Sequence, residues 1–283
     1  MERFATSLLG EAKTLLLATD GSPFSDGAIQ EAIFFGQACR ARIIVLHVVQ
    51  SQAESIHSAN FAIRQAQQEC APHLDQIRKM ADDVGVQLEV VVVGSSKPEK
   101  TIVEQARLRH ADVILMGRQG KTGHLSRLVG KMTARVISQR FPRVLVAPKD
   151  FIITGNQILL AVDDSENSRQ VILEALALGR TCVTLQGMTV MTVIKDENDR
   201  LQSQGLVDSV CDQARQDGLP VPCQAVVEVG DPAERIIAVA QQRMVDMILL
   251  GSPGKAGMMK MLLGHVTENV IGRAHCAVLV ISA

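Results

Sequence analysis

The chain has 283 residues, of which 47% are hydrophobic and 21% are charged, and its formal net charge is −1. This composition excludes a disordered chain and provides enough core for one large or two ordinary globular domains. The near-neutral net charge and the absence of Trp and Tyr also disfavour a nucleic-acid binder, which usually has a basic surface and aromatic side chains that stack on bases.

Membrane and metal-binding classes are disfavoured by patterns along the chain. No apolar run approaches the roughly 18 residues that span a bilayer, and the charges in MERFATSLLGEAK disfavour a signal peptide. The six cysteines include no CxxC pair, and the seven histidines show no HxxxH or HExxH spacing. We therefore expect a cytoplasmic protein with no membrane segment and no metal site.

Strand and helix signals alternate along the first half of the chain. Short apolar runs rich in β-branched residues predict strands of a parallel sheet, buried on both faces, at 15–19, 43–49, 86–94, 112–117 and 143–148. Helical patterns between these runs predict helices at 25–39, 53–84, 98–109 and 129–140. Such alternation indicates right-handed crossovers and an α/β, Rossmann-like, open doubly wound sheet of five strands.

The second half repeats the first. Residues 98–117 align without gaps on residues 232–251, and the glycine pattern and closing VLV that follow recur at the same offset of 134 residues. We therefore predict two copies of one domain, at residues 1–150 and 151–283. The connector APKDFIITGNQ is short and partly apolar, so we expect it to pack against the domains.

Polar residues and glycines follow the predicted strands where an open parallel sheet binds its ligands, at the carboxyl ends. Asp20 and Asp163 follow the first strand of each copy. Glycines spaced by two and then nine residues follow the fourth strand, and the last glycine precedes a helix whose N–H groups would face an anion. GKT within this loop lacks the spacing of a P-loop. The pattern predicts a phosphate site, unless the glycines only turn the chain.

Taken together, these motifs resemble those of the universal stress proteins, as two UspA-type domains in tandem. The resemblance covers both halves and rests on TD or VD after the first strand, HVV, ADVILMG, the glycine loop and the closing VLV. It implies an adenine nucleotide alpha hydrolase-like fold that binds ATP, ADP or AMP, with or without Mg²⁺. The residues that the resemblance places at the nucleotide are Asp20, Val48, Met116, Gly117, Gly120 and Gly130 in the first half, and Asp163, Val193, Leu250, Gly251, Gly254 and Gly264 in the second.

One departure from the family affects the phosphate end of both loops. ATP-binding members follow the last glycine with Ser or Thr, whereas this chain has Lys131 and His265. Loss of these hydroxyl donors is expected to shift preference toward AMP or ADP, or to leave a site without nucleotide. The first loop is the more basic, which makes it the better candidate if one site fills; its cations are Arg118, Lys121, His124, Arg127 and Lys131.

We expect a binding protein and not an enzyme. Neither an SGGxDS-type pyrophosphate loop nor a GxSxG elbow is present. A stress-response sensor or regulator that acts through unidentified protein partners is the preferred function, and a scaffold of the same fold without nucleotide is the alternative. The resemblance also implies that the last strands, 143–148 and 276–282, pair to form an internal pseudo-dimer; by analogy, whole chains are expected to form a homodimer in turn.

Overall fold

The computed structural model describes residues 9–51, 56–119, 129–182, 184–252 and 263–282. Strands and helices alternate through the first half, with a short 3₁₀ turn η1 (Pro23–Ser25) before the first helix. Its strands are β1 (Thr14–Ala18), β2 (Arg42–Gln50), β3 (Leu88–Ser95), β4 (Val113–Gly117) and β5 (Arg143–Ala147). Its helices are α1 (Asp26–Ala38), α2 (Ile56–Asp82), α3 (Pro98–Leu108) and α4 (Lys131–Ser138).

The second half repeats this order. A short 3₁₀ turn, η2 (Glu197–Asp199), precedes its second helix. Its strands are β6 (Gln157–Ala161), β7 (Gly187–Ile194), β8 (Cys223–Val229), β9 (Met247–Gly251) and β10 (Ala277–Ile281). Its helices are α5 (Glu166–Thr181), α6 (Arg200–Gln216), α7 (Pro232–Gln242) and α8 (His265–Arg273). The four helices and five strands predicted in the first half are confirmed, apart from shifts of a few residues at their ends.

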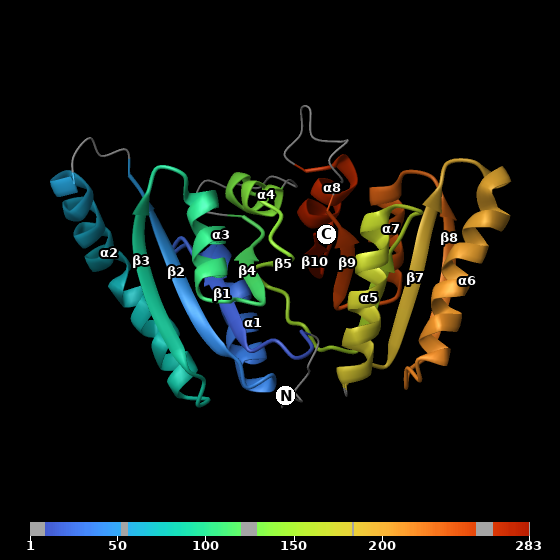
Figure 1. The fold of residues 1–283 in the computed structure, drawn as a ribbon, viewed down its shortest axis with the longest axis horizontal. Helices are drawn as coiled ribbons and strands as arrows, with labels where there is room; N and C mark the ends of the chain where they lie inside the picture. Colours follow the sequence, from blue (N-terminus) through green and yellow to red (C-terminus); the bar gives the residue numbers. More distant parts are fainter. Residues whose placement is uncertain (1–8, 52–55, 120–128, 183, 253–262, 283) are drawn as a thin grey trace.

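All ten strands form one sheet in the order β3-β2-β1-β4-β5-β10-β9-β6-β7-β8 (Figure 1). Within each half every neighbouring pair is parallel, as predicted for a doubly wound domain. The halves join where β5 pairs antiparallel with β10, with Leu145 opposite Leu279. The predicted pairing of the last strands is therefore confirmed, and it takes place within one chain.

Helices cover both faces of the sheet, and each face carries a core that runs through both halves. One core contains Leu15 of β1 and residues of α1, α2, α5 and α6. The other contains Leu16 of β1 and residues of α3, α4, α7 and α8. Consecutive strand residues point to opposite faces, so a strand buried on both sides must be apolar throughout, which explains the continuous apolar runs. Continuity of the two cores ties the halves into one folded body.

The chain starts and ends its helices with recurring local signals. Pro98 and Pro232 stand at the first position of α3 and α7, where a missing N–H is not needed. After α3 and α7 the backbone turns through positive φ, at His110 (53°) and Met244 (50°). These two positions are 134 residues apart, so the repeat extends to the geometry of the turns.

The connector between the halves packs as predicted. Ile153 is fully buried, and its N–H donates to the Glu31 carboxylate of α1 (3.1 Å). The Asp246 carboxylate accepts hydrogen bonds from the N–H groups of Thr154 (2.9 Å) and Gln157 (2.8 Å), which fixes the entry into β6. A buried carboxylate that accepts main-chain N–H groups replaces the water that a loop would otherwise bind.

One prediction about the strands is wrong. The run at 86–94 was expected to be buried on both faces, but no residue of β3 is fully buried, and β8 contains only one buried residue, Val227. Both strands lie at an end of the sheet. Apolar composition predicts a strand but does not tell how many neighbours it has, so an edge strand and a central strand look alike in sequence.

Candidate functional site

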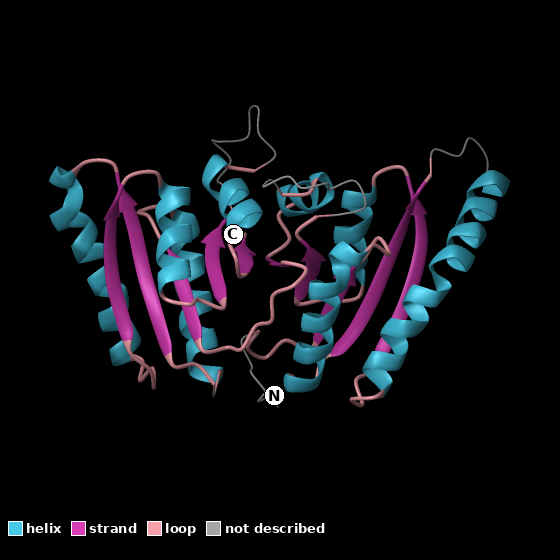
Figure 2. Ribbon diagram, turned by 180° about the vertical axis from the view of Figure 1, so that it is seen from behind, coloured by secondary structure: helices cyan, strands magenta, loops and turns pink. Residues whose placement is uncertain are grey.

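The strand order places the predicted residues of each half at one edge of the sheet. In both halves the order reverses between two neighbouring strands, β1 and β4 in the first half and β6 and β9 in the second. Asp20 and Asp163 follow β1 and β6, while Gly117 and Gly251 end β4 and β9. We call the carboxyl-end edge of each half its rim. In Figure 2 the outer strands of both halves point to the same side of the molecule, where the two rims lie.

A cavity of about 460 Å³ lies at the rim of the second half. Every described residue that was predicted for this half lines it: Asp163, Val193, Leu250, Gly251, Gly264 and His265. Its apolar wall also includes Met191 and Ile236, and its polar side includes Ser165, Asn167 and Thr267. The lining of the cavity therefore combines apolar side chains with hydroxyl and main-chain groups.

Asp163 is held in a tight turn by two serines. Its Oδ1 accepts hydrogen bonds from the Ser165 N–H (3.0 Å), the Ser165 hydroxyl (2.5 Å) and the Ser168 hydroxyl (2.6 Å). Partial burial raises the pKa of the Asp163 carboxyl, but the hydrogen bonds from Ser165 and Ser168 outweigh it, so that the pKa lies below its usual value. The carboxylate is therefore ionised at neutral pH and its orientation is fixed.

The glycines of the second rim allow close approach of the backbone. A Cβ atom at Gly251 would lie 3.1 Å from the Cβ of Asn167, and the Asn167 side-chain amide donates to the Ser252 carbonyl (2.7 Å). Gly264 is the N-cap of α8, and the Thr267 hydroxyl donates to the Gly251 carbonyl (3.5 Å). The first turn of α8 is thereby fixed beside the end of β9, with its main-chain N–H groups at the cavity.

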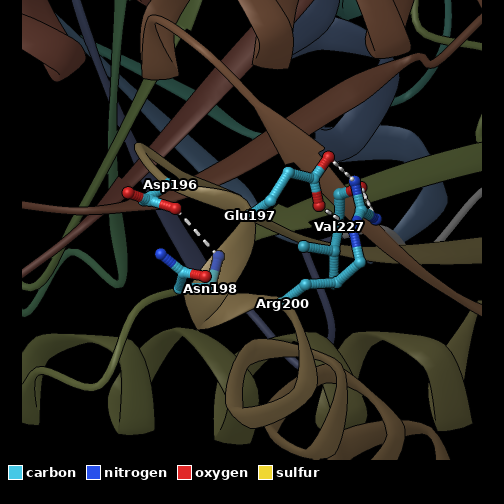
Figure 3. A network of polar contacts seen from close by, with 5 residues as sticks. All are labelled: Asp196, Glu197, Asn198, Arg200 and Val227. Atoms are coloured by element: carbon cyan, nitrogen blue, oxygen red, sulfur yellow. Dashed lines mark hydrogen bonds and ion pairs between the residues drawn. The ribbon is translucent and has the colours of Figure 1, made fainter.

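A network of polar contacts fixes the loop that follows Val193 (Figure 3). The Asp196 carboxylate accepts from the Asn198 N–H (2.9 Å) and caps η2. Arg200, the first residue of α6, pairs with Glu197 (2.9 Å) and also donates to the Val227 carbonyl of β8 (3.3 Å). The end of β7, which supplies part of the apolar wall of the cavity, is thus held against α6 and β8.

The first rim has the same plan with different chemistry. Asp20 accepts hydrogen bonds from the Ser22 N–H (3.0 Å) and the Ser25 hydroxyl (3.3 Å), as Asp163 does in its own turn. Beside it, Thr19 contacts two imidazoles, through its carbonyl to His47 (3.0 Å) and through its hydroxyl to His73 of α2 (3.3 Å). In the second half, Val162 stands in the place of Thr19 and Thr192 in the place of His47. The hydrogen bond between these two positions of the first rim therefore has no histidine in the second.

The described glycines of the first rim lie in close contact with the backbone. At Gly117 a Cβ atom would lie 2.5 Å from the Phe24 carbonyl oxygen, so any side chain is excluded. The Gly130 N–H donates to the Arg118 carbonyl (2.8 Å), and the Thr133 hydroxyl donates to the Gly117 carbonyl (3.0 Å). Lys131, the first residue of α4, is exposed.

Two of the predicted site residues, Gly120 and Gly254, lie outside the described residues, as do Lys121, His124 and Arg127 of the basic loop. Val48 pairs with Val93 in the sheet, and Met116 is buried at the end of β4. The sequence favoured the first loop because of its cations, and this preference stays a prediction because residues 120–128 lie outside the described residues; the cavity described above shows only that the second rim is hollowed. Charge in a loop and the shape of a cavity are separate properties, and only the first can be read from composition.

Several residues that fix the two rims were missed by the sequence analysis. Ser165 and Ser168 hold Asp163, and Thr133 and Thr267 tie a helix to a strand end, but none was predicted as part of a site. The recurrence of Thr133 and Thr267 at an offset of 134 was a usable signal. Ser165 and Ser168 gave a weaker one, because serine after an Asp commonly forms a local turn whether or not a ligand binds.

In the part of the chain that the structure describes, no group of three or more His, Cys, Asp or Glu side chains could hold a metal ion. None of the helices described combines the length and the apolarity needed to cross a membrane.

Comparison with known proteins gives a consistent result. The model of the universal stress protein family matches residues 11–148 and again 156–282. A universal stress protein of Synechocystis sp. is 25% identical over 295 aligned residues, which cover 94% of this chain and 99% of the relative. A shorter universal stress protein of the same organism is 27% identical over 150 residues, covering 44% of this chain and 96% of its own length.

Solved structures share the whole fold. The crystal structure of a universal stress protein from Archaeoglobus fulgidus covers 95% of this chain and 98% of its own, with a TM-score of 0.77 at 20% identity. A universal stress protein in complex with cAMP matches 44% of this chain at 19% identity, but its TM-score of 0.35 is too low to place a ligand here. Because the family model matches both halves of the sequence, the chain belongs to the universal stress protein family.

Proposed function

We propose that this protein is a stress-response protein that binds an adenine nucleotide in the rim cavity of its second half. The observation that supports the proposal is the cavity itself. Residues that the family resemblance assigns to the nucleotide, among them Asp163, Gly251 and Gly264, line one space. A volume of about 460 Å³ also lies within the range of about 300–1,000 Å³ usual for small-molecule sites.

The apolar and the polar lining residues of the cavity suit the two ends of a nucleotide. Val193, Leu250 and Met191 supply an apolar wall against which a flat base would pack. Asp163, ionised and held by its serines, offers a carboxylate oxygen to a ribose hydroxyl. The phosphates would face the start of α8 at Gly264, where main-chain N–H groups and the helix dipole favour an anion.

The phosphate end of the site supports ADP or AMP over ATP. His265 is the first residue of α8 and is exposed, in the place where ATP-binding relatives carry a hydroxyl. An imidazole is larger than a hydroxyl group and does not reproduce its place beside the last glycine. Mg²⁺ would depend on the phosphates for most of its ligands, because Asp163 contributes one carboxylate and hard cations take six or more oxygens.

The first experiment is to denature the purified protein, identify any released nucleotide by mass spectrometry and measure its ratio to the chain. We expect an adenine nucleotide, and ADP or AMP in preference to ATP. Titration calorimetry with ATP, ADP and AMP then ranks the three ligands on protein freed of nucleotide. If nothing is released and millimolar ligand produces no heat, the proposal fails and the scaffold alternative takes its place.

A matched pair of variants distinguishes the two rims. Asp163→Asn keeps the size of the side chain but removes its charge, and we expect the Kd for ADP to rise about tenfold, equivalent to about 1.4 kcal/mol. Asp20→Asn makes the same change at the equivalent position of the first half and is expected to leave that Kd unchanged. Equal losses in both variants, or loss in Asp20→Asn alone, would contradict the placement of the ligand in the second half.

We further propose that the protein acts by binding, with nucleotide occupancy altering its contacts with protein partners. Among the described residues at the rim cavity, a nucleophile activated by a neighbouring base is not found; Ser165 and Ser168 both donate to Asp163 and serve its turn. ATP turnover that survives unchanged in Asp163→Asn does not arise at the second rim and does not bear on the proposal. The proposal would be contradicted if the wild-type protein hydrolysed ATP at the rate of an ordinary enzyme and Asp163→Asn abolished that hydrolysis.

A further inference from the structure

A second cavity, of about 710 Å³, lies between the halves. Its walls come from the first rim, the connector and the second half, and include Phe24, Arg118, Lys149, Phe151 and Arg273. It shares no lining residue with the nucleotide cavity proposed above. We call it the interhalf cavity.

Cations dominate the charged groups of the interhalf cavity. Arg118, Lys149 and Arg273 line it together with a single carboxylate, Asp150. The guanidinium of Arg118 donates to the carbonyl groups of Gly272 (3.3 Å) and Ala274, which carry no full charge to neutralise it. Lys149 and Arg273 are both exposed at the surface of the cavity. Arg273 contacts Glu234 at 3.8 Å, which is a loose pair with an exposed carboxylate.

Aromatic side chains supply the apolar part of the walls. The Phe151 and His275 rings meet edge to face, with centroids 5.9 Å apart. Burial and the neighbouring charge of Arg118 lower the pKa of His275, so its ring is neutral at pH 7. Phe24 and Ile237 complete the apolar lining. A flat apolar group could therefore pack against the rings while the cations lie within the same cavity.

We propose that the interhalf cavity binds a small aromatic anion, with its ring against Phe24 and Phe151 and its negative group toward Arg118, Lys149 and Arg273. The combination of an apolar wall and convergent cations is the usual composition of such sites. Asp150 works against the anion, but three cations outnumber it. This site is separate from the nucleotide site and does not depend on it.

The connector gives the cavity a fixed shape. Ile153, two residues beyond Phe151, is anchored to Glu31, and Arg118 is anchored to the end of α8. Anchored elements lose little conformational freedom when a ligand binds, so the entropic cost of binding is smaller.

The test uses two fluorescent probes of similar shape, 1-anilinonaphthalene-8-sulfonate, which is an anion, and N-phenyl-1-naphthylamine, which is neutral. The intact chain contains no Trp or Tyr that would interfere. We expect the wild-type protein, in saturating ADP to occupy the rim, to bind the anion at least about tenfold more tightly than the neutral probe. The double variant Lys149→Gln/Arg273→Gln should lose this preference while its affinity for the neutral probe is kept.

The control variant Arg169→Gln/Arg215→Gln removes two exposed cations from α5 and α6 and should bind both probes as the wild type does. Circular dichroism of all three proteins verifies that they are folded. The proposal is overturned if the double variant keeps the preference for the anion, or if the control variant loses it equally. It is also overturned if ADP displaces the anion completely, since the probe would then occupy the rim. Failure of ADP to bind would leave these comparisons intact and would count only against the nucleotide proposal.

Discussion

Gly27 shows how one residue controls the distance between α1 and the connector. A Cβ atom at this position would lie 1.9 Å from the carbonyl oxygen of Pro148 and 2.9 Å from that of Lys149. Both are backbone atoms, which cannot move aside as the end of a long side chain can. Gly27 therefore lets the connector run directly over the start of the helix.

We predict that Gly27→Ala destabilises the protein by about 1–3 kcal/mol, the usual effect of overpacking. Gly205→Ala is the matched control, because Gly205 lies inside α6 with nothing within 4 Å of its Cβ position. That substitution should stabilise the protein by about 0.5–1 kcal/mol, since alanine is the better helix former. Urea unfolding followed by far-UV circular dichroism measures both. Equal midpoints for the two variants would show that the connector does not lie over α1.

At the scale of residues, the sequence indicates a position well where the signal is local or repeated. Asp163 and Gly251 were selected because equivalent residues stand in the first half at the same strand ends; both line one cavity, and their part in binding stays a prediction. Arg118 could not be selected in this way, because its side chain reaches carbonyl groups more than 150 positions away, at Gly272 and Ala274. No pattern near Arg118 indicates that contact, which depends on how the two halves are joined.

At the scale of elements, α8 belongs to both sites. Its first turn lines the rim cavity of the second half at Gly264 and His265. Its last turn accepts hydrogen bonds from Arg118, which follows β4 of the other half, and burial lowers the pKa of that guanidinium without removing its charge. A cation at the carboxyl end of a helix also stabilises the helix through its dipole.

We predict that Arg118→Gln destabilises the protein by about 1.5–3 kcal/mol, the range for hydrogen bonds to a charged group. Hydrogen exchange should accelerate most in the last turn of α8 and at the start of β10. Arg169→Gln breaks an exposed pair with Glu166 and should change stability by less than about 1 kcal/mol. Unchanged exchange in α8 after Arg118→Gln would show that the contact contributes nothing in solution.

The helices and strands were predicted better than their burial and their neighbours in the fold. Apolar runs identified β1, β4 and β5 correctly as buried strands, because these strands have a neighbour on each side. The same type of run was misjudged in β3, whose place at the end of the sheet depends on topology and not on composition. The interhalf cavity was not predicted at all, since its walls meet only after the halves have joined through β5 and β10.

For the whole molecule, the central question is whether the two halves unfold together. Leu145 of β5 faces Leu279 of β10 across the antiparallel junction, and both side chains are fully buried in the core that runs through both halves. Loss of packing at this point removes contacts from the first and the second half alike.

We predict that Leu145→Ala costs about 2–5 kcal/mol and accelerates hydrogen exchange in β2 and β7 to a similar extent. Ile77→Ala, a buried change in α2, serves as the comparison because it lies within the first half. It should affect β2 more than β7. Exchange that increases only in β2 after Leu145→Ala would mean that the halves unfold independently.

The pairing of β5 with β10 has a consequence for polymerisation. It leaves β3 and β8 as the two ends of the described sheet, and because these strands differ in sequence, the molecule has a head and a tail. Contact of β3 with β8 of the next molecule would be heterologous and would grow without limit, whereas β3 with β3 would close as a two-fold pair. Glu89, 55% exposed on β3, and Pro222, which precedes β8 and lacks an N–H, both oppose such growth. The chain thus places a charge at one end and a missing donor at the other, where a filament would otherwise begin.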